Sequence, residues 1–202
     1  TMSVTDSMNR LPTVIQGGMG IAVSNWVLAN TVSRRGQMGV VSGTGIDSVV
    51  ARRLQIGDPG GHMRRAIDHF PFPEMARRIL DAYFIPGGKA EDAPFKLNPM
   101  KKMNLSRRSA ELLIVSNFVE VWLAKENHEG VVGINYLEKI QRPTLPSMYG
   151  AMLGGVDFVL MGAGIPLAIP GILDKLAEWD VVELKLGVAD NPNRHVYSQT
   201  FD

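Results

Sequence analysis

The sequence predicts an α/β domain built on a parallel sheet. Short apolar segments alternate with amphipathic ones, and several of the apolar segments run directly into glycine-rich loops. This alternation is typical of a parallel sheet, because a helical crossover joins each strand to the next. The chain has 202 residues, of which 45% are hydrophobic, so a sizeable core can be buried within one domain covering residues 1–202.

Two strand–loop–helix units open the chain. A short apolar strand at 14–16 leads into Gly17-Gly18-Met19-Gly20, and a helix follows with Ser24 as its expected N-cap. A second strand at 38–41 ends in Ser42-Gly43-Thr44-Gly45 and is followed by another amphipathic segment. Both units therefore place glycines at the carboxyl end of a buried strand.

The middle of the chain departs from this rhythm. Six prolines within about residues 57–105 interrupt any long element, so we expect a helical insertion there, with helices near 61–69 and 74–84. A strongly apolar helix is expected over 106–127, where apolar side chains recur at helical spacing.

The alternation then resumes. We expect strands at 131–136, 156–161 and 181–188, with helices at 144–154 and 169–179 between them, followed by a polar tail. The total of about five strands is too small for a closed eight-stranded (β/α)₈ barrel, which takes about 250 residues.

Composition excludes several classes of function. Lys and Arg number 21 against 20 Asp and Glu, a balance without the basic footprint of a nucleic-acid-binding protein. No cysteine is present, so disulfides, thiolate zinc sites and a cysteine nucleophile are excluded. No apolar run approaches the roughly 18–20 residues that span a bilayer, and the first residues do not resemble a signal peptide. We therefore expect a cytoplasmic protein that binds neither nucleic acid nor membrane.

Familiar phosphate-binding and metal-binding motifs are absent. A dinucleotide fingerprint would need glycine where Val23 and Ser48 stand, and no P-loop occurs. The sequence has four histidines: His62, His69, His128 and His195. Their spacing does not suit a metal site and no third ligand accompanies them, so no metal is expected.

The strand ends are the best candidates for a ligand site, since ligands of α/β folds bind beyond the carboxyl ends of the strands. Two of the strands end in the glycine runs described above, a third contains Asn135, and a fourth runs into Gly162-Ala163-Gly164. Glycine allows backbone to approach a flat ring closely. Met19 and Met161 stand at two of these ends, where a thioether would suit contact with an aromatic ring.

Four runs at these strand ends resemble the nitronate monooxygenase (2-nitropropane dioxygenase-like) flavoproteins. They are residues 15–20, 36–44, 133–141 and 155–166. Stretches at 57–62 and 117–121 also resemble the longer branch of that family, which includes the enoyl-reductase component of polyunsaturated fatty acid synthases. The resemblance extends over nearly the whole chain from about residue 11.

The resemblance implies an FMN-dependent TIM barrel, of which this chain would form the N-terminal half and the helical insertion. It also implies eight cofactor-site residues: Gly17, Gly18 and Met19 along the isoalloxazine ring, Ser42 and Gly43 at the next strand end, Asn135 bonded to the flavin, and Gly162 and Ala163 towards the substrate. The family's catalytic histidine matches none of the four histidines, so no catalytic residue is assigned.

Three functions stay open at this point. The first is FMN-dependent oxidation of nitronates with oxygen as acceptor, and the second is NAD(P)H- and FMN-dependent reduction of an enoyl thioester. The third belongs to another class: a half-barrel that only assembles with another chain. A half-barrel exposes the edge of an apolar strand, so we expect a homo-oligomer, or a second chain or copy that completes the barrel.

Overall fold

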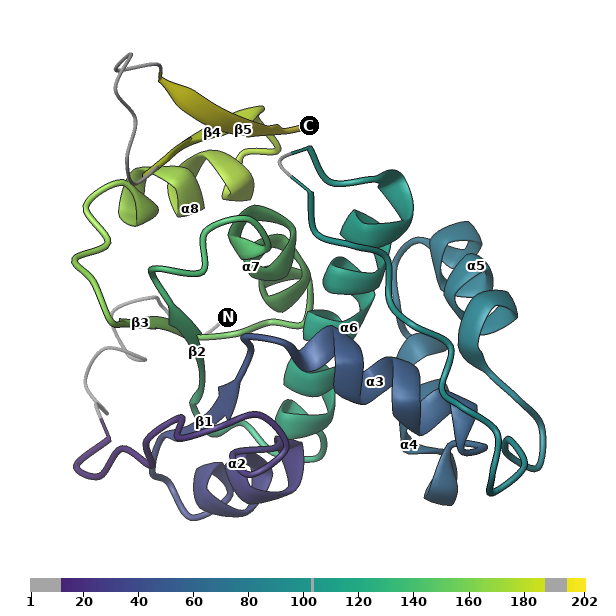
Figure 1. The fold of residues 1–202 in the computed structure, drawn as a ribbon. Coiled ribbons are helices and arrows are strands. Elements are labelled where there is room, and N and C mark those ends of the chain that lie inside the picture. Colours follow the sequence, from purple (N-terminus) through teal and green to yellow (C-terminus); the bar gives the residue numbers. More distant parts are fainter. Residues whose placement is uncertain (1–11, 103, 188–195) are drawn as a thin grey trace.

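The computed structural model describes residues 12–102, 104–187 and 196–202. The fold is mixed α/β, with a three-stranded parallel sheet, a separate two-stranded antiparallel sheet and helices between and around them (Figure 1). Val188, at the end of a predicted strand, and His195 lie outside the described residues. No helix in the described part of the chain combines the length and the apolar character needed to cross a membrane.

The parallel sheet has the strand order β1-β2-β3, the same as the order along the chain. β1 (Gly39–Ser42), β2 (Val132–Leu137) and β3 (Phe158–Gly162) confirm three of the predicted strands to within two residues. In the register of the sheet, Ser42 lies opposite Asn135, and Asn135 lies opposite Leu160.

The predicted strand at 14–16 is only partly formed. Its backbone makes an isolated parallel bridge between Ile15 and Met38, beside the start of β1. The ladder stops there because the next residue, Gln16, offers its side chain instead: its Oε1 accepts a hydrogen bond from the N–H of Val40 at 2.9 Å.

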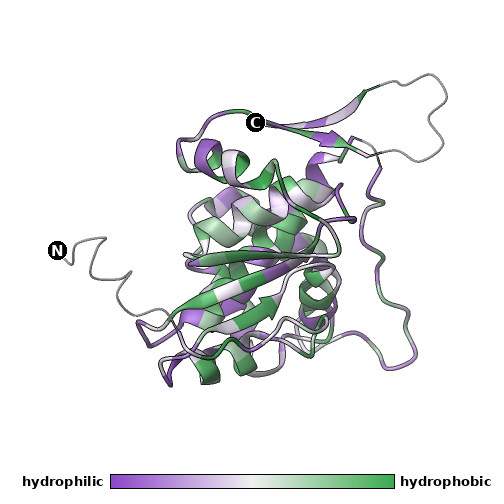
Figure 2. Cartoon of the chain, turned by 90° about the vertical axis from the view of Figure 1, so that its left-hand side faces the viewer, coloured by the Kyte–Doolittle hydropathy of each residue, from purple (hydrophilic) through white to green (hydrophobic). Residues whose placement is uncertain are grey.

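Helices cover one face of the parallel sheet. α2 (Trp26–Ser33), α6 (Arg107–Lys125) and α7 (Thr144–Leu153) pack on that face, whose apolar side chains belong to a shared cluster with them. The opposite face carries no helix in the described part of the chain, and Figure 2 views the sheet from this side. Because side chains alternate along a strand, this face, called the open face because no described helix covers it, holds Val40, Ser42, Asn135 and Leu160. Val40 and Ser42 are nevertheless buried, and Gly18 of the preceding loop lies against Val40 and Asn135.

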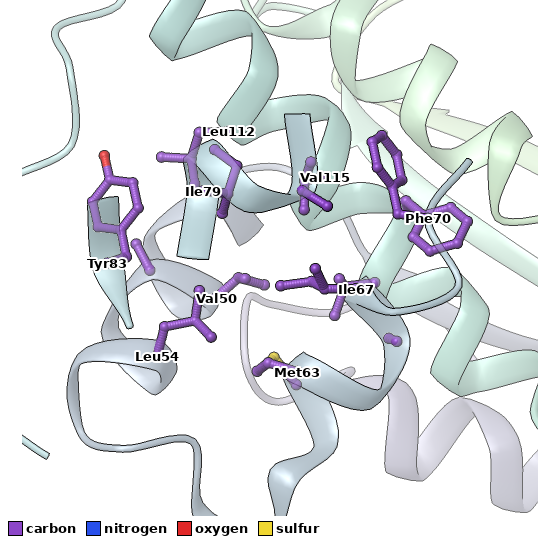
Figure 3. Close-up of a cluster of buried hydrophobic side chains, with 14 of the residues drawn as sticks. Val50, Leu54, Met63, Ile67, Phe70, Ile79, Tyr83, Leu112 and Val115 are labelled. Atoms are coloured by element: carbon purple, nitrogen blue, oxygen red, sulfur yellow. The ribbon is translucent and has the colours of Figure 1, made fainter. Parts of the chain in front are cut away.

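The stretch predicted as a helical insertion, 57–105, has helices in its first half and contributes to the core. It contains the short 3₁₀ turn η1 (Pro59–Gly61), α4 (His62–Ile67) and α5 (Pro73–Tyr83), followed by extended chain. With α3 (Ile46–Gln55) and α6, these helices enclose an apolar cluster (Figure 3). The cluster includes Val50, Leu54, Met63, Ile67, Phe70, Ile79, Tyr83, Leu112 and Val115.

Helix α6 joins the two halves of the core. One side of it, with Val115 and Val119, belongs to the cluster under the insertion, and another, with Val121 and Ala124, packs behind the sheet. The helix is therefore surrounded by protein on most of its sides, as its nearly continuous apolar sequence predicts.

The predicted strand at 181–188 forms, but it does not extend the parallel sheet. It follows α8 (Ile169–Ala177) as β4 (Val182–Leu186) and pairs antiparallel with β5 (Tyr197–Phe201) in the second sheet. Val182 and Leu184 pack against α8, so this hairpin has a small apolar layer of its own. The tail after residue 188 was expected only to be polar. Residues 197–201, with the sequence YSQTF, form β5, a strand that was not predicted.

One predicted helix cap was also wrong. The N-cap of α2 is Asn25, whose side-chain oxygen accepts a hydrogen bond from the N–H of Leu28 at 3.1 Å. Ser24, the predicted cap, is buried and turns instead towards the loop that precedes the helix.

Candidate functional site

The carboxyl ends of β1, β2 and β3 meet at one edge of the parallel sheet. This edge brings together Ser42, Gly43, Asn135 and Gly162, four of the residues predicted for the site. The N–H of Gly43 donates to the carbonyl of Asn135 at 2.9 Å, so the end of β1 is tied directly to β2.

A buried serine holds the glycine loop against this edge. The hydroxyl of Ser24 accepts a hydrogen bond from the N–H of Met19 at 2.9 Å and donates one to the carbonyl of Gly17 at 3.2 Å. The carbonyl of Ser24 accepts from the N–H of Ser42 at 2.9 Å. Gly17 to Met19 are thereby fixed beside the end of β1 without the use of their own side chains.

Gln16 completes the attachment of the loop. While its Oε1 binds the N–H of Val40, its Nε2 donates to the carbonyl of Gly17 at 2.6 Å. Neither Gln16 nor Ser24 was assigned to the site from the sequence. The signal for Gln16 is a polar side chain at the end of an apolar strand, directly before the glycines.

Gly18 and Asn135 are in contact, although they lie far apart in the sequence. The Nδ2 of Asn135 donates to the carbonyl of Gly18 at 3.3 Å. A Cβ added at Gly18 would lie 2.5 Å from the Cβ of Asn135, so only glycine fits at this position. The Oδ1 of Asn135 accepts no hydrogen bond from the residues that the structure describes, and it remains available to a ligand.

Packing within the sheet explains why position 43 is a glycine, without any ligand. A Cβ there would overlap the ring of Tyr136 and would lie 2.9 Å from the Cδ1 of Ile134, both on the helix side of β2. Gly43 therefore lets the end of β1 pack on β2, and its presence alone is no evidence for a cofactor.

The end of β3 is shaped differently. The carbonyl of Gly162 accepts a hydrogen bond from the N–H of Glu138 at 2.8 Å, and Ala163 adopts the left-handed conformation with φ of 61°. A Cβ at Gly164 would overlap the carboxylate of Glu138. The loop after β3 thus closes on Glu138, which brings a carboxylate to the predicted substrate side of the edge.

The two methionines have different surroundings. Met19 is 76% exposed in the glycine loop. Met161 lies opposite Tyr136 in the register and packs with the apolar cluster on the helix side of the sheet. Of the two, only Met19 is available to a flat ligand lying on the open side.

Three cavities of the described chain lie away from this edge. Those of about 450 and 600 Å³ lie among the helices, around Glu111 and Arg78. A pocket of about 190 Å³ lies beside β3 and is lined by Glu138, Met161 and the loop after β3. None of the eight predicted residues lines these three cavities. At the edge itself Gly17 and Met19 are exposed, whereas Ser42 and Gly43 are buried.

The three described histidines have structural surroundings. The ring of His62 contacts Trp26, and that of His69 stacks on Trp122 at 4.4 Å. His128 lies at the end of α6, where its Nε2 is 2.7 Å from the carbonyl of Ala124. Among the described residues no group of three or more His, Cys, Asp or Glu side chains has the arrangement of a metal site.

A buried carboxyl group behind the site was not expected from the sequence. Glu120 of α6 is 2% exposed, and its Oε1 accepts a hydrogen bond from the N–H of Trp26 at 2.7 Å. Burial raises the pKa of Glu120 to about 7, although the bond from Trp26 and the charge of Arg53 act in the other direction. The signal in the sequence is a single acidic residue within an otherwise apolar stretch of helix.

Comparison with known proteins adds no assignment. No model of a known protein family matches the chain, and neither a curated protein nor a solved structure matches it. The fold and the edge geometry define the class: a mixed α/β protein whose three-stranded parallel sheet is covered by helices on one face and has a glycine-lined carboxyl edge.

Proposed function

We propose that this chain belongs to an FMN-dependent oxidoreductase that oxidises nitronates with oxygen as acceptor. The observation that carries the proposal is the contact of Gly18 with Asn135 at the carboxyl edge of the sheet. It places a glycine backbone and a free amide oxygen together on the open face, as the resemblance to the nitronate monooxygenase flavoproteins requires.

The residues present fit a flat ring at this edge. A Cβ added at Gly17 or Gly20 would have no atom within 4 Å, so the loop presents bare backbone on its outer side. The Oδ1 of Asn135 has no hydrogen-bond donor among the described residues, and Ser42, which is 6% exposed, lies opposite Asn135 on the same face. Gly17, Gly18, Met19 and Asn135 would contact FMN, and Ser42 and Gly43 would form the strand end beside it. Gly162 and Ala163 would lie next to the substrate.

FMN, when bound, supplies a ring that accepts electrons from a nitronate and passes them to oxygen. The residues of this chain orient that ring and hydrogen-bond to it. Because Ser24 and Gln16 fix the loop from behind, the backbone of Gly17 and Gly18 is already placed before any ligand arrives. Such preorganisation lowers the entropy that binding costs.

We propose a barrel-type arrangement for the parallel sheet. Its strands follow one another in chain order and its helices lie on one face, whereas a doubly wound sheet has helices on both. The open face would then correspond to the interior of a (β/α)₈ barrel, and a second chain or copy would cover it. β4 lies outside this arrangement, because it pairs with β5.

The test measures FMN binding by the purified chain, with the quenching of flavin fluorescence as the readout. Asn135→Ala should weaken FMN binding about tenfold, since the amide bonds to the flavin. The matched control is Asn127→Gly, which removes an amide before the amino end of β2, at a left-handed position that glycine adopts without strain. Equal FMN affinity of wild type and Asn135→Ala would refute the assignment of this residue.

The same preparation separates the three functions. Oxygen uptake with ethyl nitronate supports the proposed reaction, whereas oxidation of NADPH with a crotonyl thioester under nitrogen supports the enoyl reductase. A chain that binds no FMN, alone or in its native assembly, is not an oxidoreductase of this kind and would fit the assembly module.

A further inference from the structure

The second sheet has an edge that is suited to pairing with a copy of itself. Among the described residues β4 pairs with β5 only, so the other edge of β4 has no partner strand. Val182 and Leu184 face α8, while Glu183 and Lys185 are exposed on the outer face. Unpaired strand edges are sites of association between chains.

We infer that two copies of the chain associate through antiparallel pairing of β4 with β4 of the second copy, about a two-fold axis at Leu184. This inference is independent of the proposed function. In that register Glu183 of each copy lies opposite Lys185 of the other, and Val182 lies opposite Leu186. Every exposed charge therefore meets an opposite charge, twice by symmetry, and every apolar side chain meets another apolar one.

The charges select this register over its neighbours. A shift that keeps the apolar side chains on the same face moves the axis by one residue, to Glu183 or to Lys185. The axis then places Glu183 opposite Glu183, or Lys185 opposite Lys185, and like charges that lie directly opposite each other are unfavourable. Only the axis at Leu184 pairs both charges.

The surroundings of β4 fit a four-stranded sheet with the order β5-β4-β4-β5. α8 packs against β4, so the two copies of α8 would lie on the same face of the joined sheet. The N–H of Gly187, directly after β4, donates to the Oε1 of Gln141 at 2.8 Å, so this N–H already has a partner. Ile165 and Leu167, which are 78% and 87% exposed, line the same small pocket as Leu184. Polar residues, among them Glu138 and Gln141, also line this pocket.

Sedimentation equilibrium of the 202-residue chain tests the inference through charge reversal. Glu183→Lys and Lys185→Glu each place like charges opposite each other, so each should raise the dissociation constant of the dimer at least about tenfold. The double variant Glu183→Lys/Lys185→Glu restores both pairs in reversed order and should return the constant to near the wild-type value. Glu129→Lys, the same charge change at an exposed site before β2, should leave it unchanged.

Restoration of dimerisation in the double variant supports this register. If the single variants lost dimerisation because β4 and β5 had unfolded, a second charge reversal would not restore it. A wild-type chain that stays monomeric at about 100 µM would refute the inference. Unchanged dimerisation in both single variants would also refute it, since the interface would then lie elsewhere. Circular dichroism of each variant establishes that the fold is retained.

Discussion

The carboxylate of Glu120 on α6 accepts a hydrogen bond from the backbone N–H of Trp26, the first residue of α2, at 2.7 Å. A negative charge at the start of a helix is favourable, but here it lies in the core, 2% exposed. The bond joins the central helix to the element that directly follows the glycine loop. Burial is the stronger influence, and it raises the pKa of Glu120 to about 7.

This pKa predicts how stability varies with pH. In the unfolded chain Glu120 titrates near its ordinary value of 4.5, so between pH 4.5 and 7 the folded state keeps a proton that the unfolded state loses. The free energy of unfolding should therefore fall as the pH rises through this interval, by about 3 kcal/mol from this group. Glu120→Gln, which stays neutral and keeps an acceptor oxygen, should remove most of that fall. Urea denaturation at several pH values measures it, and identical pH profiles for both proteins would contradict the assignment.

Glu111, on the same helix, should behave in the opposite way. Burial raises its pKa, but hydrogen bonds from Arg78 and Arg107 outweigh this and hold the pKa below 4.5. The stabilisation is therefore present above pH 4.5 and is lost as the pH falls through the lowered pKa. Glu111→Gln should cost about 2 kcal/mol at neutral pH and less in acid.

The control for Glu111 is Glu74→Gln. Glu74 is exposed, and its Oε2 lies 3.7 Å from the Nη1 of Arg78, which is a long and solvent-screened contact. Its replacement should therefore change the free energy of unfolding by less than about 0.5 kcal/mol. Equal losses for the two variants would mean that the burial of Glu111 does not matter.

Two glycines of the predicted site should differ in their tolerance of alanine. At Gly43 a Cβ would overlap Tyr136, whose hydroxyl donates to the Oδ1 of Asn117 at 2.8 Å and is fixed in the core. Gly43→Ala should therefore cost about 1–3 kcal/mol. At Gly162 the nearest atom to an added Cβ is 3.8 Å away, and Gly162→Ala should be nearly neutral. Thermal unfolding of both variants distinguishes them, and a neutral Gly43→Ala would contradict the packing of β1 on β2.

The parts of the fold that depend on local sequence were predictable. β1, β2 and β3 are short apolar runs, and α6 is a long apolar run between polar segments, so each element was placed to within about two residues. Strand pairing is less local. The sequence of 182–186 predicts a strand correctly, but its antiparallel partner at 197–201 depends on contacts that no local pattern contains.

The candidate site was predictable as a set of strand ends, but not in its internal support. The register brings Ser42 beside Asn135, as parallel strands that end together must. The role of Ser24 was missed because a serine before a helix is usually its N-cap, and here the adjacent Asn25 takes that role. Glu120 was missed because the acidic residues of an amphipathic helix normally face solvent, whereas α6 has protein on most of its sides.

The role of Ser24 leads to a test that separates the loop from the rest of the fold. Ser24 and Ser33 are both 1% exposed, and each hydroxyl joins two backbone groups. The hydroxyl of Ser24 binds Met19 and Gly17, whereas that of Ser33 donates to the carbonyl of Val131 at 2.6 Å and accepts from the N–H of Gly39 at 3.1 Å. Alanine at either position should cost about 1–3 kcal/mol, because buried polar groups lose a partner.

Only Ser24→Ala should change the ligand edge. Removing its hydroxyl frees the N–H of Met19, so hydrogen exchange at that amide should become faster in Ser24→Ala and stay unchanged in Ser33→Ala. If the loop holds FMN, the flavin affinity of Ser24→Ala should also fall about tenfold, since the loop must then be ordered on binding. An equal loss of affinity in Ser33→Ala would show that overall stability, rather than the loop, controls binding. The two variants remove the same group from equally buried sites, but only the hydroxyl of Ser24 contacts the loop, where it also accepts a hydrogen bond from the Nε2 of Gln16 at 3.3 Å. A loss of affinity that is confined to Ser24→Ala therefore points to the position of the loop.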